Sequence, residues 1–253
     1  MSSSGVAVTG HESSTITNFQ WGRDSIHLKL WYLKCHTLQD LTPRPIFAMS
    51  TTGVTLATDL LASDPHFMCT ISIRQLCTSI QNSRLERTGR VISLTRFEQQ
   101  RGFRHQFIVL KIGMMPDDGE AIWLRLDRGP KPENSTPRSS VSRFTPCDSA
   151  TISSSEAQLL YGLRLEMKAE VVFPVNGPTA GDLRELFNIL SQESPEYRLW
   201  GENCKWFCSV VQENLTHFYS GELRSGTLSH RDLGKKSRRR IAHRFLSVIA
   251  QSH

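Results

Sequence analysis

Two strongly apolar segments, 105–112 and 121–127, are separated by the turn-rich stretch 113–119. Alternation and β-branched residues in both segments are typical of extended strands, and a polar turn between two such strands predicts a β-hairpin. Segment 91–97 has the same character and predicts a further strand just before the hairpin. The chain is therefore expected to contain an antiparallel sheet.

Helical spacing of apolar residues appears elsewhere in the chain, with an amphipathic helix expected near 70–83. A second helix is introduced by Thr179 and ends near Ser194, and a third begins after Asn203, a favoured N-cap residue. A last helix over 235–249 has Ile241, Phe245, Leu246 and Ile249 on its inner face. The combination predicts an α+β fold in which a small antiparallel sheet packs against the helix that begins at Asn203.

A chain of 253 residues is long enough for one main domain with irregular extensions. Residues 129–155 collect Pro, Ser, Thr and Asn, which predicts a long loop, whereas 159–173 is strand-like. The predicted organisation is a flexible N-terminal arm at 1–18, a segment of unclear role at 19–89, a core at 90–220 and a basic C-terminal helix at 221–253.

The net charge of +6 is concentrated near the C-terminus. Such a basic cluster suits nucleic acid, an anionic membrane surface, an import receptor or an acidic partner, but it is also the usual composition of a solvated helix face. The absence of interleaved aromatic residues makes nucleic acid an unfavoured partner. The cluster consists of Arg231, Lys235, Lys236, Arg238, Arg239, Arg240 and Arg244.

The six cysteines form no CxxC pair, and a chain of this length folds without disulfides, which favours a reduced, intracellular setting, cytoplasmic or nuclear. The first residues do not resemble a secretory signal, and no run of about eighteen apolar residues predicts a transmembrane segment. No His and Cys pair has metal-ligand spacing, and no Gly-rich phosphate loop is present, so neither a metal nor a nucleotide cofactor is expected. Nothing in the sequence fixes the oligomeric state.

Cys204 falls in the first turn of the helix that Asn203 is expected to cap. Unpaired backbone N–H groups and the helix dipole favour negative charge there, which lowers the pKa of a thiol. The same N–H groups, with the Asn203 side chain, suit an oxyanion on a substrate acyl group. The alternative is that Cys204 is a small buried residue, as Cys208 one turn further is expected to be.

Among nine histidines, His105 is the candidate partner, because it starts an apolar strand whose edge a helix N-terminus can meet. If Ile112 pairs with Ala121, or nearly so, His105 faces the stretch from Asp127 to Arg128, where a carboxylate is able to orient the imidazole. The alternatives are a solvated surface histidine and an ion pair of Asp127 with Arg125 or Arg128.

The segments Arg104-His-Gln-Phe-Ile-Val109 and Tyr197-Arg-Leu-Trp-Gly-Glu-Asn-Cys-Lys-Trp-Phe207 resemble the circularly permuted papain-fold superfamily. That superfamily includes PPPDE-type deubiquitinating or deSUMOylating peptidases and lecithin retinol acyltransferase-like proteins, in which the catalytic His precedes the catalytic Cys. The resemblance covers about residues 90 to 220. It implies that Cys204 is the nucleophile, His105 the base and Asp127 the orienting group.

The chain also departs from these relatives. The acyltransferase members carry a second His on the following strand and an apolar membrane segment, and the PPPDE members have a Gly-rich strand after the His and no long loop like 129–155. We therefore expect a divergent thiol hydrolase that acts on an amide, isopeptide or thioester bond of a protein or acyl substrate. The alternatives are an acyltransferase with the same site and a non-catalytic papain-like interaction protein. Trp123, Trp200 and Trp206 are the candidate substrate-binding residues.

Overall fold

A computed structural model describes residues 68–101, 104–114, 121–131, 143–198, 201–228 and 234–252. The predicted arm at 1–18 and the following residues up to 67 lie outside the described part of the chain. The described residues form an α+β fold in which helices pack on a seven-stranded antiparallel sheet, and two short strands form a separate two-stranded sheet. The predicted α+β class is therefore confirmed.

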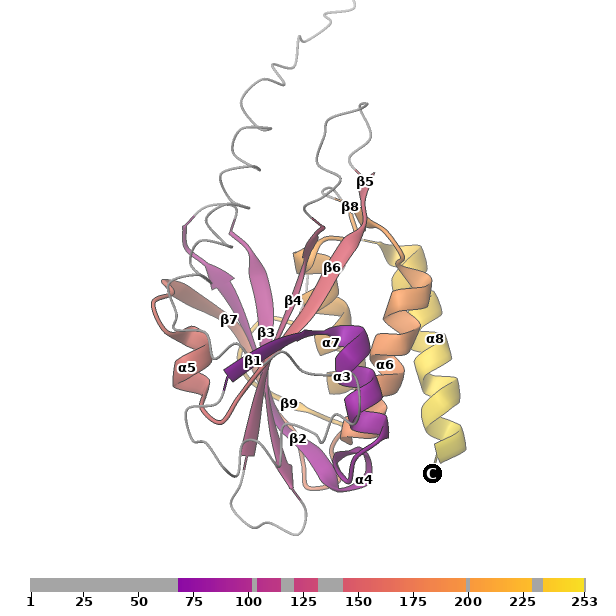
Figure 1. The fold of residues 1–253 in the computed structure, drawn as a ribbon. Coiled ribbons are helices and arrows are strands. Elements are labelled where there is room, and N and C mark those ends of the chain that lie inside the picture. The colour runs from indigo at the N-terminus through magenta and orange to yellow at the C-terminus, as the bar shows by residue number, and fades with distance from the viewer. Residues whose placement is uncertain are drawn as a thin grey trace, which may run out of the picture. The chain divides into compact units, whose positions relative to one another are not determined.

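The sheet has seven strands in the order β1-β6-β4-β3-β2-β7-β9, and every neighbouring pair is antiparallel (Figure 1). The predicted hairpin forms its centre as β3 and β4, and the predicted preceding strand is β2. The sheet is thus larger than the small one predicted. Its strands are β1 (Met68–Ser72), β2 (Gly89–Gln99), β3 (Gln106–Met114), β4 (Ala121–Pro130), β6 (Pro146–Ser153), β7 (Leu165–Val172) and β9 (Glu222–Gly226), while β5 (Arg143–Phe144) and β8 (Tyr197–Arg198) pair separately.

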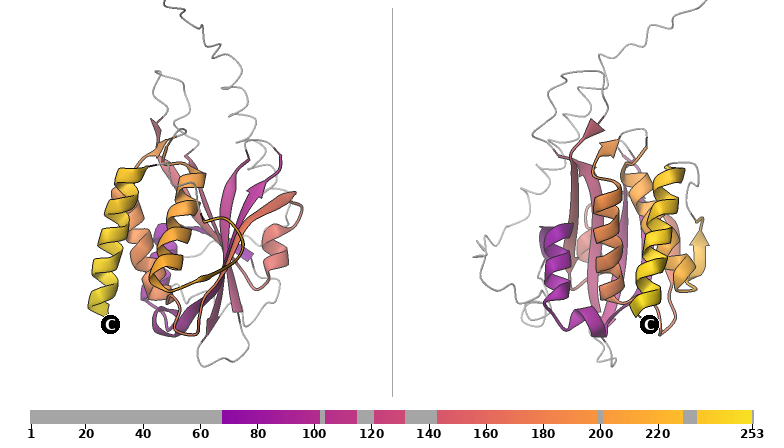
Figure 2. Two further views of the ribbon diagram at one scale, coloured as in Figure 1. Left: turned by 180° about the vertical axis from the view of Figure 1, so that it is seen from behind. Right: turned by 90° about the vertical axis from the view of Figure 1, so that its right-hand side faces the viewer.

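Helices cover the two faces of the sheet unequally (Figures 1 and 2). Alternate residues of β3 and β4, such as Ile108 and Leu124, point into the main core with the helices of the well-covered face. Residues of the opposite parity, such as Phe107 and Val109, form a smaller cluster with Leu159 of α5. The larger group is α3 (Ile73–Gln81), α4 (Leu85–Thr88), α6 (Ala180–Glu193), α7 (Cys204–Phe218) and α8 (Lys235–Ser252), and the other face carries α5 (Glu156–Leu160).

Side-chain caps fix where the long helices begin. Ser72 and Thr179 each accept a hydrogen bond from the backbone N–H three residues later and complete a capping box, which starts α3 and α6. Asn203 caps α7. These three helices lie where the apolar spacing predicted them, and α6 ends at Glu193, just before the predicted boundary at Ser194.

The predicted loop over 129–155 was wrong for much of its length. Residues 146–153 form β6, which lies between β1 and β4 in the sheet. Only Ala150 and Ile152 supply buried apolar side chains there, and the intervening Ser and Thr residues are held mainly by the backbone ladder, so the strand had little hydrophobic signature. The strand-like interpretation of 159–173 was wrong at its start, where α5 forms, and right for β7.

The basic C-terminal region contains β9 as well as the predicted helix, α8. Ile241 and Phe245 are buried as predicted, but Leu246 is 50% exposed and does not face the core. No described helix is both long and apolar enough to cross a membrane.

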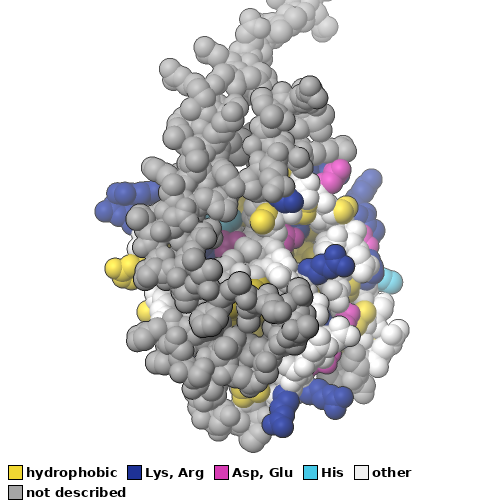
Figure 3. Space-filling view, in the orientation of Figure 1, with side chains coloured by type: hydrophobic (Ala, Val, Ile, Leu, Met, Phe, Trp, Pro, Cys, Tyr) yellow, Lys and Arg dark blue, Asp and Glu magenta, His cyan; other side chains and the backbone are white. Residues whose placement is uncertain are grey.

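Several cations of α8 are already paired with acidic side chains of neighbouring helices. Arg238 pairs with Glu213 of α7, and Arg240 and Arg244 pair with Glu193 of α6 at 2.6 and 2.8 Å. On the face drawn in Figure 3, cationic and acidic side chains of the described residues are interspersed. Part of the C-terminal positive charge therefore forms ion pairs that hold α8 against α6 and α7.

Candidate active site

Cys204 is the first residue of α7, as predicted. Its N-cap Asn203 has an extended backbone, and the side-chain oxygen of Asn203 accepts a hydrogen bond from the Trp206 N–H at 3.1 Å. Cys204 is only 9% exposed, whereas Cys208, one turn further, is completely buried as expected. The thiol of Cys204 therefore lies at the start of a capped helix, where the helix dipole favours a negative charge.

His105 directly precedes β3 and is held by Asp127 of β4. Its imidazole Nε2 lies 2.9 Å from Oδ1 of Asp127. The hairpin register pairs Ile112 with Ile122 rather than with Ala121, one residue from the predicted pairing. In this register Asp127 lies diagonally across from His105 on the same face of the sheet, and the two side chains meet.

Asp127 also binds Arg125, so the predicted alternative of an ion pair coexists with the contact to His105. Arg125 donates from Nε to Oδ2 at 2.9 Å and from Nη2 to Oδ1 at 3.0 Å. Burial opposes ionisation of Asp127, but the Arg125 charge and the hydrogen bond from His105 outweigh burial and hold the pKa of Asp127 well below its usual range. Asp127 therefore remains a carboxylate.

His105 is 8% exposed and is nevertheless stabilised in its charged form. Burial acts to lower its pKa, but hydrogen bonds to Asp127 and to Cys204, with the charges of both partners, raise the pKa to about 9. At neutral pH the imidazole is then an imidazolium ion between a carboxylate and a sulfur atom.

The ionisation of Cys204 is shifted in the complementary direction. Burial raises the pKa of this thiol, but the hydrogen bond and charge of His105, together with the backbone N–H groups of Gln106 and Lys205, outweigh burial and lower it. The two shifts favour a thiolate–imidazolium pair, in which each charge stabilises the other. Cys204, His105 and Asp127 are thus brought together in one chain of contacts.

Two further residues contact Cys204 that the sequence did not single out. Gln106 contributes a backbone N–H to the sulfur, and the Tyr197 hydroxyl is hydrogen-bonded to both the backbone and the side chain of Cys204. Burial and the nearby Cys204 charge raise the pKa of Tyr197, so its phenol stays protonated. Both residues lie in the two segments that carry the resemblance. Their contacts with Cys204 depend on tertiary packing, which the sequence pattern does not predict.

Two of the three predicted substrate-binding tryptophans lie in the described part of the chain. Trp206 is fully buried and lies against Arg128 and the start of α8, where its ring has no exposed surface to offer a substrate. Trp123 packs on the α5 face of the sheet, where Lys111 lies over its ring. Trp200 lies outside the described residues.

Among the residues that the structure describes, no three His, Cys, Asp or Glu side chains are grouped as ligands for a metal ion. The chemistry that the described site offers is that of a thiolate, an imidazolium and hydrogen-bond donors at a helix N-terminus.

Comparison of the chain with protein-family models, with curated proteins and with solved structures found no match.

Proposed function

We propose that the chain is an enzyme with a cysteine nucleophile. More narrowly, we propose a hydrolase of amide, isopeptide or thioester bonds with a permuted papain-like arrangement. The observation that carries the proposal is the continuous set of contacts from the Cys204 thiol through His105 to Asp127 at the start of a capped helix. The order of His105, Asp127 and Cys204 along the chain is the order that the resemblance implies.

The first half of the reaction acylates Cys204. The thiolate attacks the substrate carbonyl carbon, a sulfur–carbon bond forms, and the carbonyl electrons move onto oxygen. The backbone N–H groups of Gln106 and Lys205 and the Tyr197 hydroxyl, which are hydrogen-bonded to Cys204, are the donors that we assign to this oxyanion. The carbon–nitrogen or carbon–sulfur bond then breaks as His105 gives its proton to the leaving group.

The second half releases the acyl group. Water gives a proton to neutral His105 and attacks the thioester carbonyl, after which the sulfur leaves as thiolate and the carboxylic acid departs. Because Nε2 of His105 is held by Asp127, we assign both proton transfers to Nδ1. Asp127 orients the ring and stabilises the imidazolium ion without taking the proton.

The closeness of Cys204 and His105 favours this function over a non-catalytic interaction protein, which would have no need for a thiol of lowered pKa. An acyltransferase shares the first half of the reaction. The two activities separate in the second half, where an added amine or alcohol competes with water for the acyl group.

The proposal is tested with an electrophilic acyl probe that labels reactive thiols. Cys204→Ala is expected to abolish labelling at neutral pH and to leave the melting temperature nearly unchanged, because the side chain lost is small. Cys208→Ala is the matched control on the same helix and should keep the labelling. Undiminished labelling of Cys204→Ala would contradict the proposed function.

A further inference from the structure

A buried carboxylate beside the site has no part in the reaction described above. Glu98 lies on β2, and its side chain is only 4% exposed. Burial acts to raise the pKa of Glu98, but a hydrogen bond from Gln106 and the charges of three cations outweigh burial and lower it. A buried charge is costly unless it is well paired, so a carboxylate kept in this position calls for an explanation.

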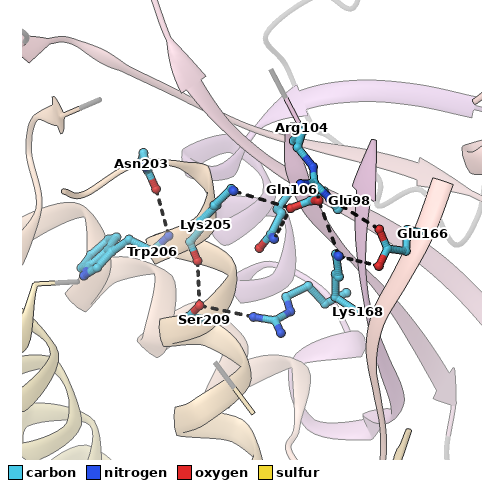
Figure 4. A network of polar contacts seen from close by, with 10 residues as sticks. Glu98, Arg104, Gln106, Glu166, Lys168, Asn203, Lys205, Trp206 and Ser209 are labelled. Atoms are coloured by element: carbon cyan, nitrogen blue, oxygen red, sulfur yellow. Dashed lines mark hydrogen bonds and ion pairs between the residues drawn. The ribbon is translucent and has the colours of Figure 1, made fainter. Parts of the chain in front are cut away.

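The partners of Glu98 include both chain neighbours of His105 and the residue after Cys204, and Figure 4 shows them around the Glu98 side chain. Gln106, the residue after His105, donates from Nε2 to Oε2 of Glu98 at 2.8 Å. Arg104, the residue before His105, lies with Nε 2.8 Å from Oε1 of Glu98. Lys205, the residue after Cys204, places Nζ 3.6 Å from Oε2.

The contacts of Glu98 hold the backbone on both sides of His105. Arg104 has φ = 53°, a left-handed conformation that is unfavourable for a residue with a β-carbon and persists only where other contacts impose it. Gln106 supplies the backbone N–H that reaches the Cys204 sulfur. Fixing the side chains of both residues therefore fixes the turn that presents His105 and the N–H that faces the thiolate.

We propose that Glu98 is a positioning residue of the Cys204–His105 pair, because it holds both neighbours of His105 and the residue that follows Cys204. Glu98 acts through Arg104, Gln106 and Lys205. The inference rests on the proposed function, since it explains how that site is held together.

Glu166 provides a matched control in the same network (Figure 4). It lies 3.8 Å from Arg104 and 2.6 Å from Lys168, and Lys168 in turn lies 3.5 Å from Glu98. Glu166 is 45% exposed, and its ion pairs among the described residues are with Arg104 and Lys168 rather than with Gln106 or Lys205. Neutralising Glu166 thus removes a nearby negative charge but leaves the contacts of Gln106 and Lys205 with Glu98 in place.

The experiment measures the rate of iodoacetamide alkylation at Cys204 between about pH 5 and pH 10, resolved by peptide mass spectrometry, which gives the apparent thiol pKa. Glu98→Gln is expected to raise that pKa by about one unit and to slow alkylation at neutral pH about tenfold, because the thiolate loses its aligned partners. Glu166→Gln is expected to leave both quantities unchanged.

The direction in which the thiol pKa changes distinguishes a positioning role of Glu98 from a purely electrostatic one. Removing a negative charge and releasing Lys205 near a thiolate would by itself lower the thiol pKa. A lowered pKa in Glu98→Gln would therefore overturn the inference, and so would a fall in melting temperature with an unchanged pKa. The charges of His105 on Cys204, of Arg96 and Asp127 on Cys208, and of Arg128 on Tyr197 are all retained in both variants.

Gln106→Met is the second variant, for use also if Glu98→Gln does not fold. It keeps the backbone N–H and the length of the side chain but removes the hydrogen bond to Glu98, so it should also raise the thiol pKa. An unchanged pKa in Gln106→Met would contradict the inference. If instead the wild-type thiol pKa is not lowered and Cys204→Ala still reacts with the acyl probe, the proposed function itself fails.

Discussion

Cys204 and Cys208 lie one turn apart on the same helix, and their environments drive their ionisation in opposite directions. Burial and the nearby Cys204 charge raise the pKa of Cys208 well above its ordinary value, and the positive charge of Arg96 does not offset them. Cys204 is also buried, but His105 and two backbone N–H groups outweigh burial and lower its pKa. The opposite shifts come from the imidazolium partner and the backbone N–H groups beside Cys204, rather than from the residue type.

Removing the imidazole should have the largest effect, because it makes Cys204 resemble Cys208. His105→Gln is expected to slow iodoacetamide alkylation of Cys204 at pH 7 about a hundredfold, since the thiolate loses its cationic partner. Peptide mass spectrometry measures the alkylation of both cysteines in one sample, and the slow alkylation expected of Cys208 should be the same in both proteins. Equal alkylation of Cys204 in wild type and variant would show that the helix start alone activates the thiol.

Removing the carboxylate that orients His105 should have a smaller effect. Asp127→Asn keeps the shape of the side chain but removes the charge that stabilises the imidazolium ion, so alkylation of Cys204 at pH 7 should slow about tenfold. Arg125 loses an ion-pair partner in this variant, so Arg125→Gln is the control for that loss. If Arg125→Gln slows alkylation as much as Asp127→Asn does, the effect belongs to the arginine.

The contact between His105 and Asp127 also predicts how the stability of the fold depends on pH. The pKa of His105 is raised to about 9 in the folded chain, compared with about 6.5 when unfolded, so this group stabilises the fold fully below about pH 6.5. That contribution disappears as the pH rises through about 9. The free energy of unfolding should therefore differ between wild type and Asp127→Asn by about 2 kcal/mol at pH 6, and by less at pH 10. Urea unfolding at the two pH values measures the change, and a difference that grows with pH would contradict the assignment.

The helix cap should have the smallest effect on the contrast between the two cysteines. Asn203→Ala removes the hydrogen bond to the Trp206 N–H and is expected to cost about 1 kcal/mol of unfolding free energy, with a severalfold loss of Cys204 alkylation. Asn203→Asp retains a capping oxygen and should retain most of the stability. Equal losses in both variants would mean that the amide nitrogen of Asn203, and not the cap, is what matters.

Parts of this arrangement were readable in the sequence because they rest on local chemistry. Apolar spacing identified α6 and α7, the cap at Asn203 placed Cys204 in the first turn, and the hairpin brought Asp127 near His105 within one residue of register. Strand β6 was missed because its burial depends on small residues, and α5 because it is short and buries only Leu159.

The remaining features of the site depend on packing between distant segments. Glu98 and Gln106 are neighbours across β2 and β3, and Tyr197 reaches Cys204 from the segment before α7. Trp206 was a candidate substrate-binding residue because it lies two positions from Cys204, but its side chain is buried in the core and lies against the start of α8. No periodicity within a single segment encodes such contacts.

The central claim is that Cys204 and His105 form a thiolate–imidazolium pair. The most direct measurement is a pH titration of thiolate absorbance in wild-type protein, with Cys204→Ala as the difference reference and Cys208→Ala as the control. If the two residues form this pair, the Cys204 transition lies below the ordinary thiol value of about 8.5 and survives in Cys208→Ala. A Cys204 transition at or above that value would contradict it.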